Sequence, residues 1–282
     1  MNHPSVVGID LGATNVRGGV VQQGNISGIL SKKIHSRGTE EEVMQDLFSI
    51  TDQLVNKDVA AIGIGVPSVV DTELGIVYDV QHIPSWVEVP LKQRMEERYH
   101  IPVFVNNDAN CFALGEFYFG KGQGSTNMIG LTVGTGLGAG IIINKHLYAG
   151  PNCGAGEFGM VEYLDHCLEY YCCGQFFQNV YHTDGQQVFE RAAAGDAQAL
   201  QWYAEMGLHL GKAIKVIMYT YDPSLIILGG SVRFAYAYFQ QAMWQQIQSF
   251  AFTKSISRLQ IELSNLTNSG ILGAAGLYFD AQ

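Results

Sequence analysis

Two glycine-rich segments with the same layout place the strongest constraint on how this chain folds. One runs from Gly8 to Asn15 and the other from Thr132 to Gly140. In each, an apolar stretch leads into a turn of Gly and Thr, and a second apolar stretch follows. The pattern predicts two β-hairpins whose turns expose backbone N–H groups, which with a Thr hydroxyl form a concavity suited to phosphate oxygens. Two such turns could together hold one nucleoside triphosphate.

Asp10 makes the first of these turns a stronger candidate for a metal and phosphate site than the second. A single Gly-rich turn is common in ordinary hairpins, so neither segment alone establishes a phosphate site. Asp10 lies at the end of the first apolar stretch, where burial of an unpaired carboxylate is costly unless a cation or a donor meets it. The first hairpin therefore favours a role in binding metal and phosphate.

The composition is that of a soluble globular protein. The chain has 282 residues, of which 47% are hydrophobic and 15% charged, enough for one large domain or two ordinary ones. No apolar run is long and glycine-free enough to span a bilayer, and the first strand begins almost at Met1 with no secretory signal before it. Five cysteines, with Cys172 and Cys173 adjacent, favour reduced thiols. We therefore expect a cytoplasmic protein without a membrane partner.

The charge balance argues against a general nucleic-acid binder. The formal net charge is −10 and no basic stripe is present, whereas affinity for a phosphate backbone comes largely from clustered Lys and Arg. An acidic protein that binds an anionic nucleotide must use local donors. Backbone N–H groups and Mg²⁺ are the donors that this sequence favours.

Apolar stretches and helical periodicities alternate along the chain, which predicts an α/β fold. The expected strands cover residues 5–34 (two or three strands), 59–66, 102–105, 128–133, 139–143, 224–228 and 259–263. The expected helices cover residues 40–55, 90–99, 233–250 and 271–279, several helices cover roughly residues 170–221, and a further helix starts near Asp108. We expect a first domain of residues 1–115, completed by a C-terminal helix in 270–282, and a larger second domain of residues 116–269.

Asp108 is the sharpest single candidate for catalysis. It lies where a predicted strand ends and a helix begins, which is where open α/β sheets usually bind ligands. Either Asn107 or Asp108 could simply cap that helix, a role that Ser or Thr would serve equally well. The run Asn-Asn-Asp-Ala-Asn from Asn106 to Asn110 exceeds what a cap requires. A carboxylate there could accept the proton of a hydroxyl that attacks a γ-phosphate.

Seven short segments, in order along nearly the whole chain, carry a family resemblance. They are Gly8–Thr14 (GIDLGAT), Gly63–Pro67 (GIGVP), Asn107–Asn110 (NDAN), Gly134–Gly140 (GTGLGAG), Gly156–Gly159 (GEFG), Ile227–Gly230 (ILGG) and Gly270–Gly276 (GILGAAG). In this order they resemble the ROK family of sugar kinases and sugar-responsive repressors. The resemblance implies an actin-like, ribonuclease H-like ATPase fold, with two similar α/β domains around a cleft in which ATP and a sugar meet.

The resemblance also implies a role for each matching residue. Asp108 would be the base acting on the sugar hydroxyl, and Asp10 would position Mg²⁺, through water. The residues implied in ATP binding are Gly12, Thr14, Gly134, Thr135, Gly136, Gly229 and Gly230. The residues implied at the sugar are Asn107, Glu157, Glu169, His82 and Gly65. Without the resemblance, Asn107 would be a helix-start hydrogen bond and Glu157 a surface carboxylate.

Two departures from the family pattern bear on metal binding and specificity. Many members follow Gly-Glu-x-Gly with His and a Cys-rich loop that bind zinc, but Met160 stands at the His position and the following segment is short. The alignment leaves only Cys167 as a ligand, too few for tetrahedral zinc, so we expect no zinc site. It also keeps Glu169 as the second sugar glutamate. His82 stands where the family has Asn, so the sugar preference should differ from that of a typical glucokinase.

The resemblance therefore implies an ATP-dependent kinase of a hexose or amino sugar, with glucose as the default substrate. The alternative is a sugar-sensing regulator of the same family with weak or no kinase activity. Family repressors carry an N-terminal helix-turn-helix domain, and here the first hairpin begins almost at the start, so we expect no direct nucleic-acid binding. An actin-like filament protein would not need the Asn-Asp-Ala-Asn run. The aromatic-rich segment 234–244 could serve a homodimer interface or pack in the core.

Overall fold

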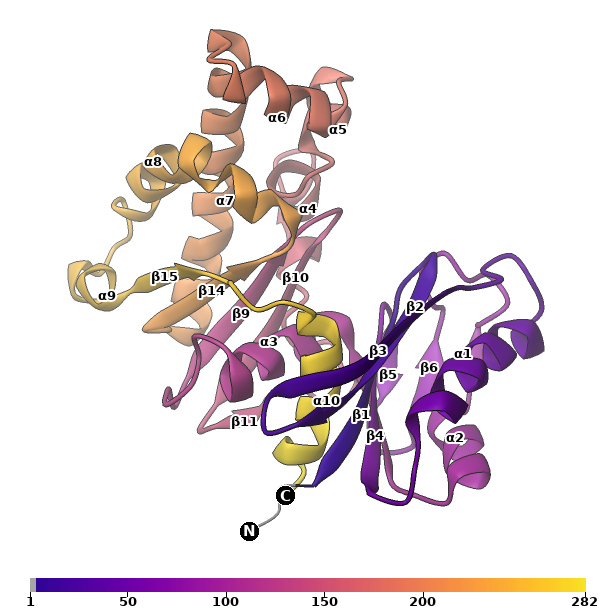
Figure 1. Ribbon diagram of the computed structural model, residues 1–282. Helices are drawn as coiled ribbons and strands as arrows, with labels where there is room; N and C mark the ends of the chain where they lie inside the picture. The colour runs from indigo at the N-terminus through magenta and orange to yellow at the C-terminus, as the bar shows by residue number, and fades with distance from the viewer. Residues whose placement is uncertain (1–3) are drawn as a thin grey trace. The chain divides into compact units, whose positions relative to one another are not determined.

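The computed structural model describes residues 4–282, and the chain forms two compact α/β units (Figure 1). The first unit contains the described residues up to Thr126, Gly140–Ala155 and Asn265–Gln282. The second contains Asn127–Ala139 and Gly156–Ser264. Within residues 4–282, no helix is both long enough and apolar enough to cross a membrane.

The first unit is organised by a five-stranded sheet in the order β3-β2-β1-β4-β8. The strands are β1 (Ser5–Leu11), β2 (Asn15–Gln22), β3 (Asn25–Lys33), β4 (Val59–Val66) and β8 (Val103–Asn107). The first three form an antiparallel meander, whereas β1, β4 and β8 are parallel. The β1–β2 pairing confirms the first predicted hairpin, and the parallel strands end at one edge, where the register sets Asp10 beside Gly65.

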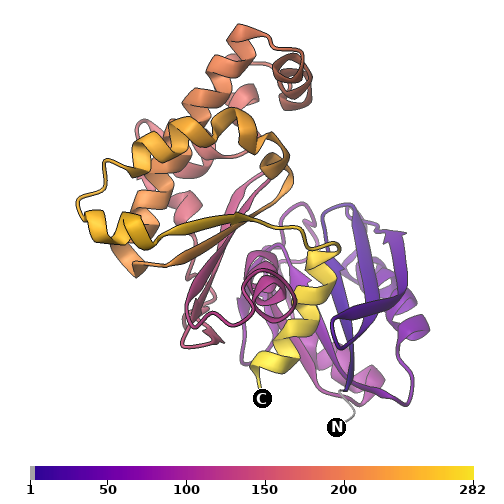
Figure 2. The ribbon, with the colours of Figure 1, turned by 60° about the vertical axis from the view of Figure 1, so that its left-hand side comes forward.

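Helix α10 (Ser269–Asp280) brings the C-terminal segment onto this sheet, beside the N-terminal strands in both views (Figure 1 and Figure 2). Its residues 271–277 are all buried. The close approach requires glycine on the strands: a Cβ added to Gly8 would lie 2.0 Å from the carbonyl oxygen of Ile271, and one added to Gly63 would lie 1.8 Å from that of Ala274. The last Gly-rich segment is thus part of the first unit's core.

Three other helices and a small sheet also belong to the first unit. Helix α1 (Glu40–Leu54) starts with a capping box between Thr39 and Glu42 and buries one apolar side, which packs in the unit's main core with Trp86. The remaining elements are α2 (Leu91–Tyr99), α3 (Asp108–Phe119), β5 (Val69–Asp71), β6 (Ile76–Tyr78) and β7 (Glu88–Val89). The sequence missed the small β5-β6-β7 sheet, whose strands are only two or three residues long.

A second five-stranded sheet has the order β11-β10-β9-β14-β15. The strands are β9 (Met128–Val133), β10 (Leu137–Ile143), β11 (His146–Leu147), β14 (Leu225–Gly229) and β15 (Gln260–Leu263). Strands β9, β14 and β15 are parallel, and the register pairs Gly229 with Thr132. Neighbouring β9 and β10 are joined by the second glycine-rich turn, so the second predicted hairpin is also confirmed.

The structure divides the helical regions of the second unit into separate elements. The helices expected over roughly residues 170–221 are α4 (Leu168–Cys172), α5 (Phe176–Tyr181), α6 (Gly185–Ala193) and α7 (Ala197–Tyr221). The expected helix of residues 233–250 is a 3₁₀ turn η2 (Ser231–Ala235) and α8 (Tyr236–Ile247). The other elements are η1 (Phe158–Met160), β12 (Glu162–Tyr163), β13 (His166–Cys167) and α9 (Thr253–Arg258). Gly207 and Gly211 let α7 pack closely on α8, because a Cβ at either would collide with backbone oxygens of α8.

Candidate active site

The residues that the sequence singled out fall into two groups, one in each unit. The first unit carries Asp10, Gly12, Thr14, Gly65, His82, Asn107 and Asp108, and the second carries Gly134, Thr135, Gly136, Glu157, Glu169, Gly229 and Gly230.

Asn107 and Asp108 have different roles at the junction of β8 and α3. Asn107 caps α3, because its Oδ1 accepts a hydrogen bond from the N–H of Ala109 at 2.8 Å, and its Nδ2 donates to the carbonyl of Ser68 at 3.2 Å. Asp108 is the first residue of the helix and is exposed, with its Oδ1 also accepting from the Ala109 N–H at 2.8 Å. Since Asn107 already caps the helix, Asp108 is not required for that role.

A buried polar cluster behind Asp108 fixes this junction. The Oδ1 of Asn106 accepts hydrogen bonds from the Asn110 amide at 2.9 Å, the Cys153 thiol at 3.1 Å and the Asn107 N–H at 2.8 Å. Among the described residues the Oδ1 of Asn110 has no partner, although it is buried. Such networks hold a side chain in one geometry. The run of asparagines therefore positions Asp108, beyond capping the helix.

Asp10, Gly65 and Asp108 lie around the same buried thiol. Burial raises the pKa of Cys111, and the charges of Asp108 and Asp10 raise it further. A Cβ added to Gly65 would lie 3.1 Å from the Cys111 sulfur and 3.9 Å from the Cα of Asp108. The end of β4 thus carries glycine where a side chain would crowd the Asp108 junction.

Asp10 is a carboxylate whose burial is only partly compensated. Burial raises its pKa, and the positive charge of Arg17, its cross-strand neighbour on β2, opposes that rise. Arg17 also donates a hydrogen bond to the side chain of Asn268, just before α10. A Cβ added to Gly270 would lie 2.5 Å from the Asp10 carboxyl carbon. The carboxylate therefore lies against the N-terminus of α10, whose dipole favours negative charge.

The turn between β1 and β2 presents its small residues to solvent. The N–H of Gly12 donates to the carbonyl of Asn15 at 2.9 Å, which closes the turn, while Thr14 is exposed. The hairpin thus has the exposed Thr and the tight glycine turn that the sequence predicted.

The second turn is braced by two other glycines of its unit. The N–H of Gly134 donates to the carbonyl of Gly136 at 3.0 Å, and the N–H of Gly174 donates to the carbonyl of Gly134 at 2.7 Å. Gly230, with a φ of 76°, lies so close to β9 that a Cβ would be 2.2 Å from the carbonyl oxygen of Val133. Thr135 is exposed at the tip. The turn, Gly174 and the Gly229–Gly230 corner therefore form one rigid group.

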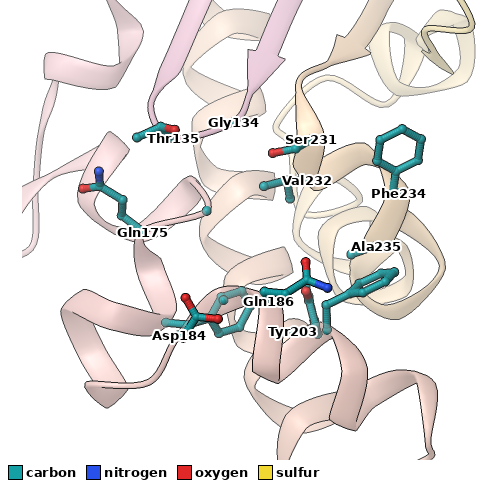
Figure 3. A pocket seen from close by; sticks show the side chains of 14 residues that line it. Gly134, Thr135, Gln175, Asp184, Gln186, Tyr203, Ser231, Val232, Phe234 and Ala235 are labelled. Carbon is teal, nitrogen blue, oxygen red and sulfur yellow. The ribbon is translucent and has the colours of Figure 1, made fainter. Parts of the chain in front are cut away.

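A cavity of about 390 Å³ lies beside this group (Figure 3). Gly134 and Thr135 line it together with Gly174 and Ser231. The rest of its lining includes four aromatic residues, which are Phe177, Phe189, Tyr203 and Phe234, and the polar residues Gln175, Asp184 and Gln186. Figure 3 shows Asp184, Gln186 and Tyr203 across the cavity from the Thr135 turn. A concave site with apolar walls and a few polar groups is typical of a small-molecule or cofactor site.

Glu157 and Glu169 form a pair of carboxylates in the same unit. Glu169 is held by the second hairpin, because its Oε2 accepts from the N–H of Leu137 at 2.8 Å and lies against Gly136. Partial burial raises the pKa of Glu157, and the negative charge of Glu169 raises it further. The structure thus brings together the two glutamates that the sequence assigned to the sugar.

Met160 and the cysteines are arranged in a different way from a metal site. Met160 is 55% exposed, whereas Cys172 and Cys173 are buried free thiols that pack as small apolar residues. Burial raises the pKa of Cys173 to about 11. Tyr163 and His209 share a hydrogen bond of 3.0 Å next to the ring of Tyr171. Within residues 4–282, no three His, Cys, Asp or Glu side chains are placed to hold a metal ion.

His82 lies on an exposed loop of the first unit. Its φ is 64°, a left-handed conformation that is uncommon outside glycine, and the neighbouring Ile83 and Trp86 are fully buried. The two buried residues anchor the loop and leave the imidazole in solvent.

Sequence reasoning missed four residues that the structure places at these groups. Arg17 lies opposite Asp10, and its position seven residues after the Asp in the same hairpin was a readable signal. Asn268 precedes Gly270 and bonds to Arg17. Asp184 and Phe234 line the cavity, and no local motif marks either of them.

Comparison with known proteins agrees with this architecture. The model of the ROK family matches residues 6–281. The chain is 31% identical to a glucokinase of Streptomyces coelicolor over 80% of this chain and 81% of that protein. It is 27% identical to the xylose repressor of Bacillus subtilis, over 97% of this chain and 77% of the repressor.

A solved structure gives the fold. A ROK family glucokinase from Streptomyces griseus, in complex with glucose and AMPPNP, has a TM-score of 0.80 and 28% identity, over 97% of this chain and 98% of that chain. ROK kinases have the actin-like ATPase fold, which this chain shares, as the sequence predicted. The chain belongs to the ROK family.

Proposed function

We propose that this protein is an ATP-dependent kinase that phosphorylates a hydroxyl of a hexose or amino sugar, with glucose as the first substrate to test. The observation that carries the proposal is Asp108, an exposed carboxylate at the end of a parallel strand, on a strand–helix junction that hydrogen bonds of Asn106 and Asn107 hold in place. Glucokinases and other sugar kinases among the relatives support the same activity.

In this proposal, Asp108 takes the proton of the sugar hydroxyl as that oxygen attacks the γ-phosphorus. The bond from the γ-phosphorus to its bridging oxygen breaks, and ADP leaves. Asn107, Gly65 and His82 of the first unit, and Glu157 and Glu169 of the second, would hold the sugar. One amide hydrogen of Asn107 is already bonded to Ser68, so a sugar hydroxyl would meet the other.

ATP would occupy the cavity of the second unit, with its phosphates at Gly134, Thr135 and Gly136 and its adenosine near Gly229 and Gly230. Gly12 and Thr14 of the first unit would also contact phosphate. An exposed Thr at each turn and the bonded glycine group beside the cavity support this assignment.

Asp10 fits a role at Mg²⁺, which we propose to be indirect, through water. Its carboxylate is an oxygen donor of the kind Mg²⁺ prefers, and its burial leaves a negative charge that Arg17 alone only partly offsets. Mg²⁺, when bound with ATP, neutralises charge on the transferred phosphoryl group. We also propose that the protein has no zinc site and that it is cytoplasmic.

A regulatory role is the second candidate, supported by the similarity to a xylose repressor. Two measurements over one panel of hexoses and N-acetyl amino sugars distinguish catalysis from sensing: ADP release from Mg-ATP, and sugar binding by calorimetry. Turnover with a sugar supports the kinase and identifies its substrate class. Sugar binding without turnover across the panel contradicts the kinase, and His82 and Met160 then become the first residues to revert to the family pattern.

A further inference from the structure

Phe234 is a large apolar side chain that remains 69% exposed at the edge of the cavity in the second unit (Figure 3). The sequence placed it in an aromatic-rich helix together with Phe239, which is 1% exposed and belongs to the core. Phe234 instead lies on η2, one segment earlier. Single exposed apolar residues are common on protein surfaces. The evidence for a role of Phe234 is therefore the contact that holds its ring and the position of the residue at the cavity, rather than its exposure.

The ring is supported from one face by Arg233. The guanidinium carbon of Arg233 lies 4.2 Å from the centroid of the Phe234 ring, a cation–π distance. Arg233 is itself tied to the backbone, because Nη1 donates to the carbonyl of Gly230 at 2.6 Å and Nε donates to that of Ser264 at 3.2 Å. These carbonyls directly follow β14 and β15. The chain therefore holds one face of an aromatic ring against a fixed cation and leaves the ring largely open.

The position of the ring links it to the phosphate turn. Ser231 and Val232, between the Gly230 corner and Phe234, line the same cavity as Gly134 and Thr135. A ligand in this cavity that carries both phosphate and a planar apolar group would find a partner for each. A nucleotide has this chemistry, whereas inorganic polyphosphate has only the first part.

We propose that Phe234 is a specificity-determining residue that contacts the nucleobase of the phosphoryl donor, so that the cavity selects a nucleotide over inorganic polyphosphate. The inference rests on the proposed function, since it takes the cavity as the donor site. An aromatic face accepts any base, because every base has a π-face. Base contact through Phe234 therefore adds affinity for nucleosides as a class.

The test compares two ligands on three variants by calorimetry in Mg²⁺. The ligands are ADP and tripolyphosphate, and the variants are Phe234→Ala, Phe234→Trp and Phe252→Ala. Phe252 is the matched control, since it is 61% exposed and makes ring contacts with Tyr219 and Phe250. Loss of a base–aromatic contact should weaken ADP binding by at least about fivefold in Phe234→Ala. Tripolyphosphate affinity should stay unchanged, and the Trp and Phe252 variants should bind both ligands as the wild type does.

Two results with the Phe234→Ala variant would overturn the inference while leaving the donor assignment in place. One is ADP binding of wild-type strength in Phe234→Ala. The other is an equal loss for both ligands, which would make Phe234 a support for the turn rather than a contact to the base. A wild type that does not bind ADP would overturn this inference and the donor assignment together. Wild-type protein that binds ADP, weakened in Phe234→Ala, but makes no sugar phosphate would support the inference while the kinase proposal fails.

Discussion

At the scale of single residues, Asp108 is an exposed carboxylate at the start of α3, a helix that the side chain of Asn107 already caps. Asp108→Asn keeps the shape of the side chain and removes its ability to take a proton. We predict that kcat falls about 10²–10⁴-fold, the usual contribution of a general base, while the affinity for ADP stays within twofold. Steady-state kinetics and ADP titration check this.

Asp58→Asn is the control for that change, because Asp58 is an exposed carboxylate in the loop before β4 of the same unit. It should leave kcat unchanged. If Asp108→Asn turns over at the control's rate, Asp108 is not the base.

The glutamate pair predicts a pH dependence of sugar binding. Partial burial and, to a smaller extent, the charge of Glu169 raise the pKa of Glu157. We propose that Glu157, in its ionised form, accepts a hydrogen bond from a sugar hydroxyl. Sugar affinity should therefore fall as the pH drops through that raised pKa. Glu169→Gln removes the second cause, so the midpoint of the fall should move to lower pH even if overall affinity decreases. Calorimetric affinities measured from pH 4 to pH 8 locate the midpoint. An unmoved midpoint would show that the charge of Glu169 does not raise the pKa of Glu157.

At the scale of elements, the packing of α10 on the first sheet depends on glycine rather than on side chains. A Cβ at Gly63 would lie 1.8 Å from the carbonyl oxygen of Ala274, so the helix must shift to admit it. Gly63→Ala should lower the free energy of unfolding by about 1–3 kcal/mol, the usual cost of overpacking. Urea denaturation measures this. Gly154→Ala is the control, since an added Cβ there meets nothing within 4 Å, and equal stability of the two variants would refute the packing argument.

The packing of the segment from β12 to α4 predicts that a chelator does not lower the thermal stability of the protein. Tyr163 and Tyr171 pack with His209 of α7, and Cys172 is fully buried nearby, so aromatic contacts and a hydrogen bond hold the segment. Dialysis against EDTA should leave the thermal midpoint unchanged, and elemental analysis should find zinc well below one equivalent. A drop in the midpoint that zinc restores would show a structural metal and contradict the expectation drawn from Met160.

At the scale of the whole molecule, the sequence predicts the parts of the fold that are encoded locally. The hairpins could be read because glycine and threonine interrupt apolar strands, and the Asp108 junction because a strand runs directly into a helix. The division of residues 170–221 into four helices could not be read in the same way. Just after α4, the N–H of Gly174 donates to the carbonyl of Gly134, about forty residues earlier in the chain, and a single-sequence pattern does not contain that contact. Phe234 was missed for a related reason. It shares a helical spacing with the aromatic residues that follow, but it lies in the 3₁₀ turn η2 whereas they lie in α8.

The most direct test of the kinase proposal follows the phosphoryl group itself. ATP labelled with ¹⁸O in the non-bridging γ-oxygens is incubated with Mg²⁺, the protein and the best sugar of the panel, and the products are identified by mass spectrometry. The proposal predicts a sugar phosphate that carries the labelled phosphoryl oxygens and retains the unlabelled sugar oxygen, because the sugar hydroxyl attacks phosphorus. Label found only in inorganic phosphate, or left in ATP while the sugar binds, would contradict it.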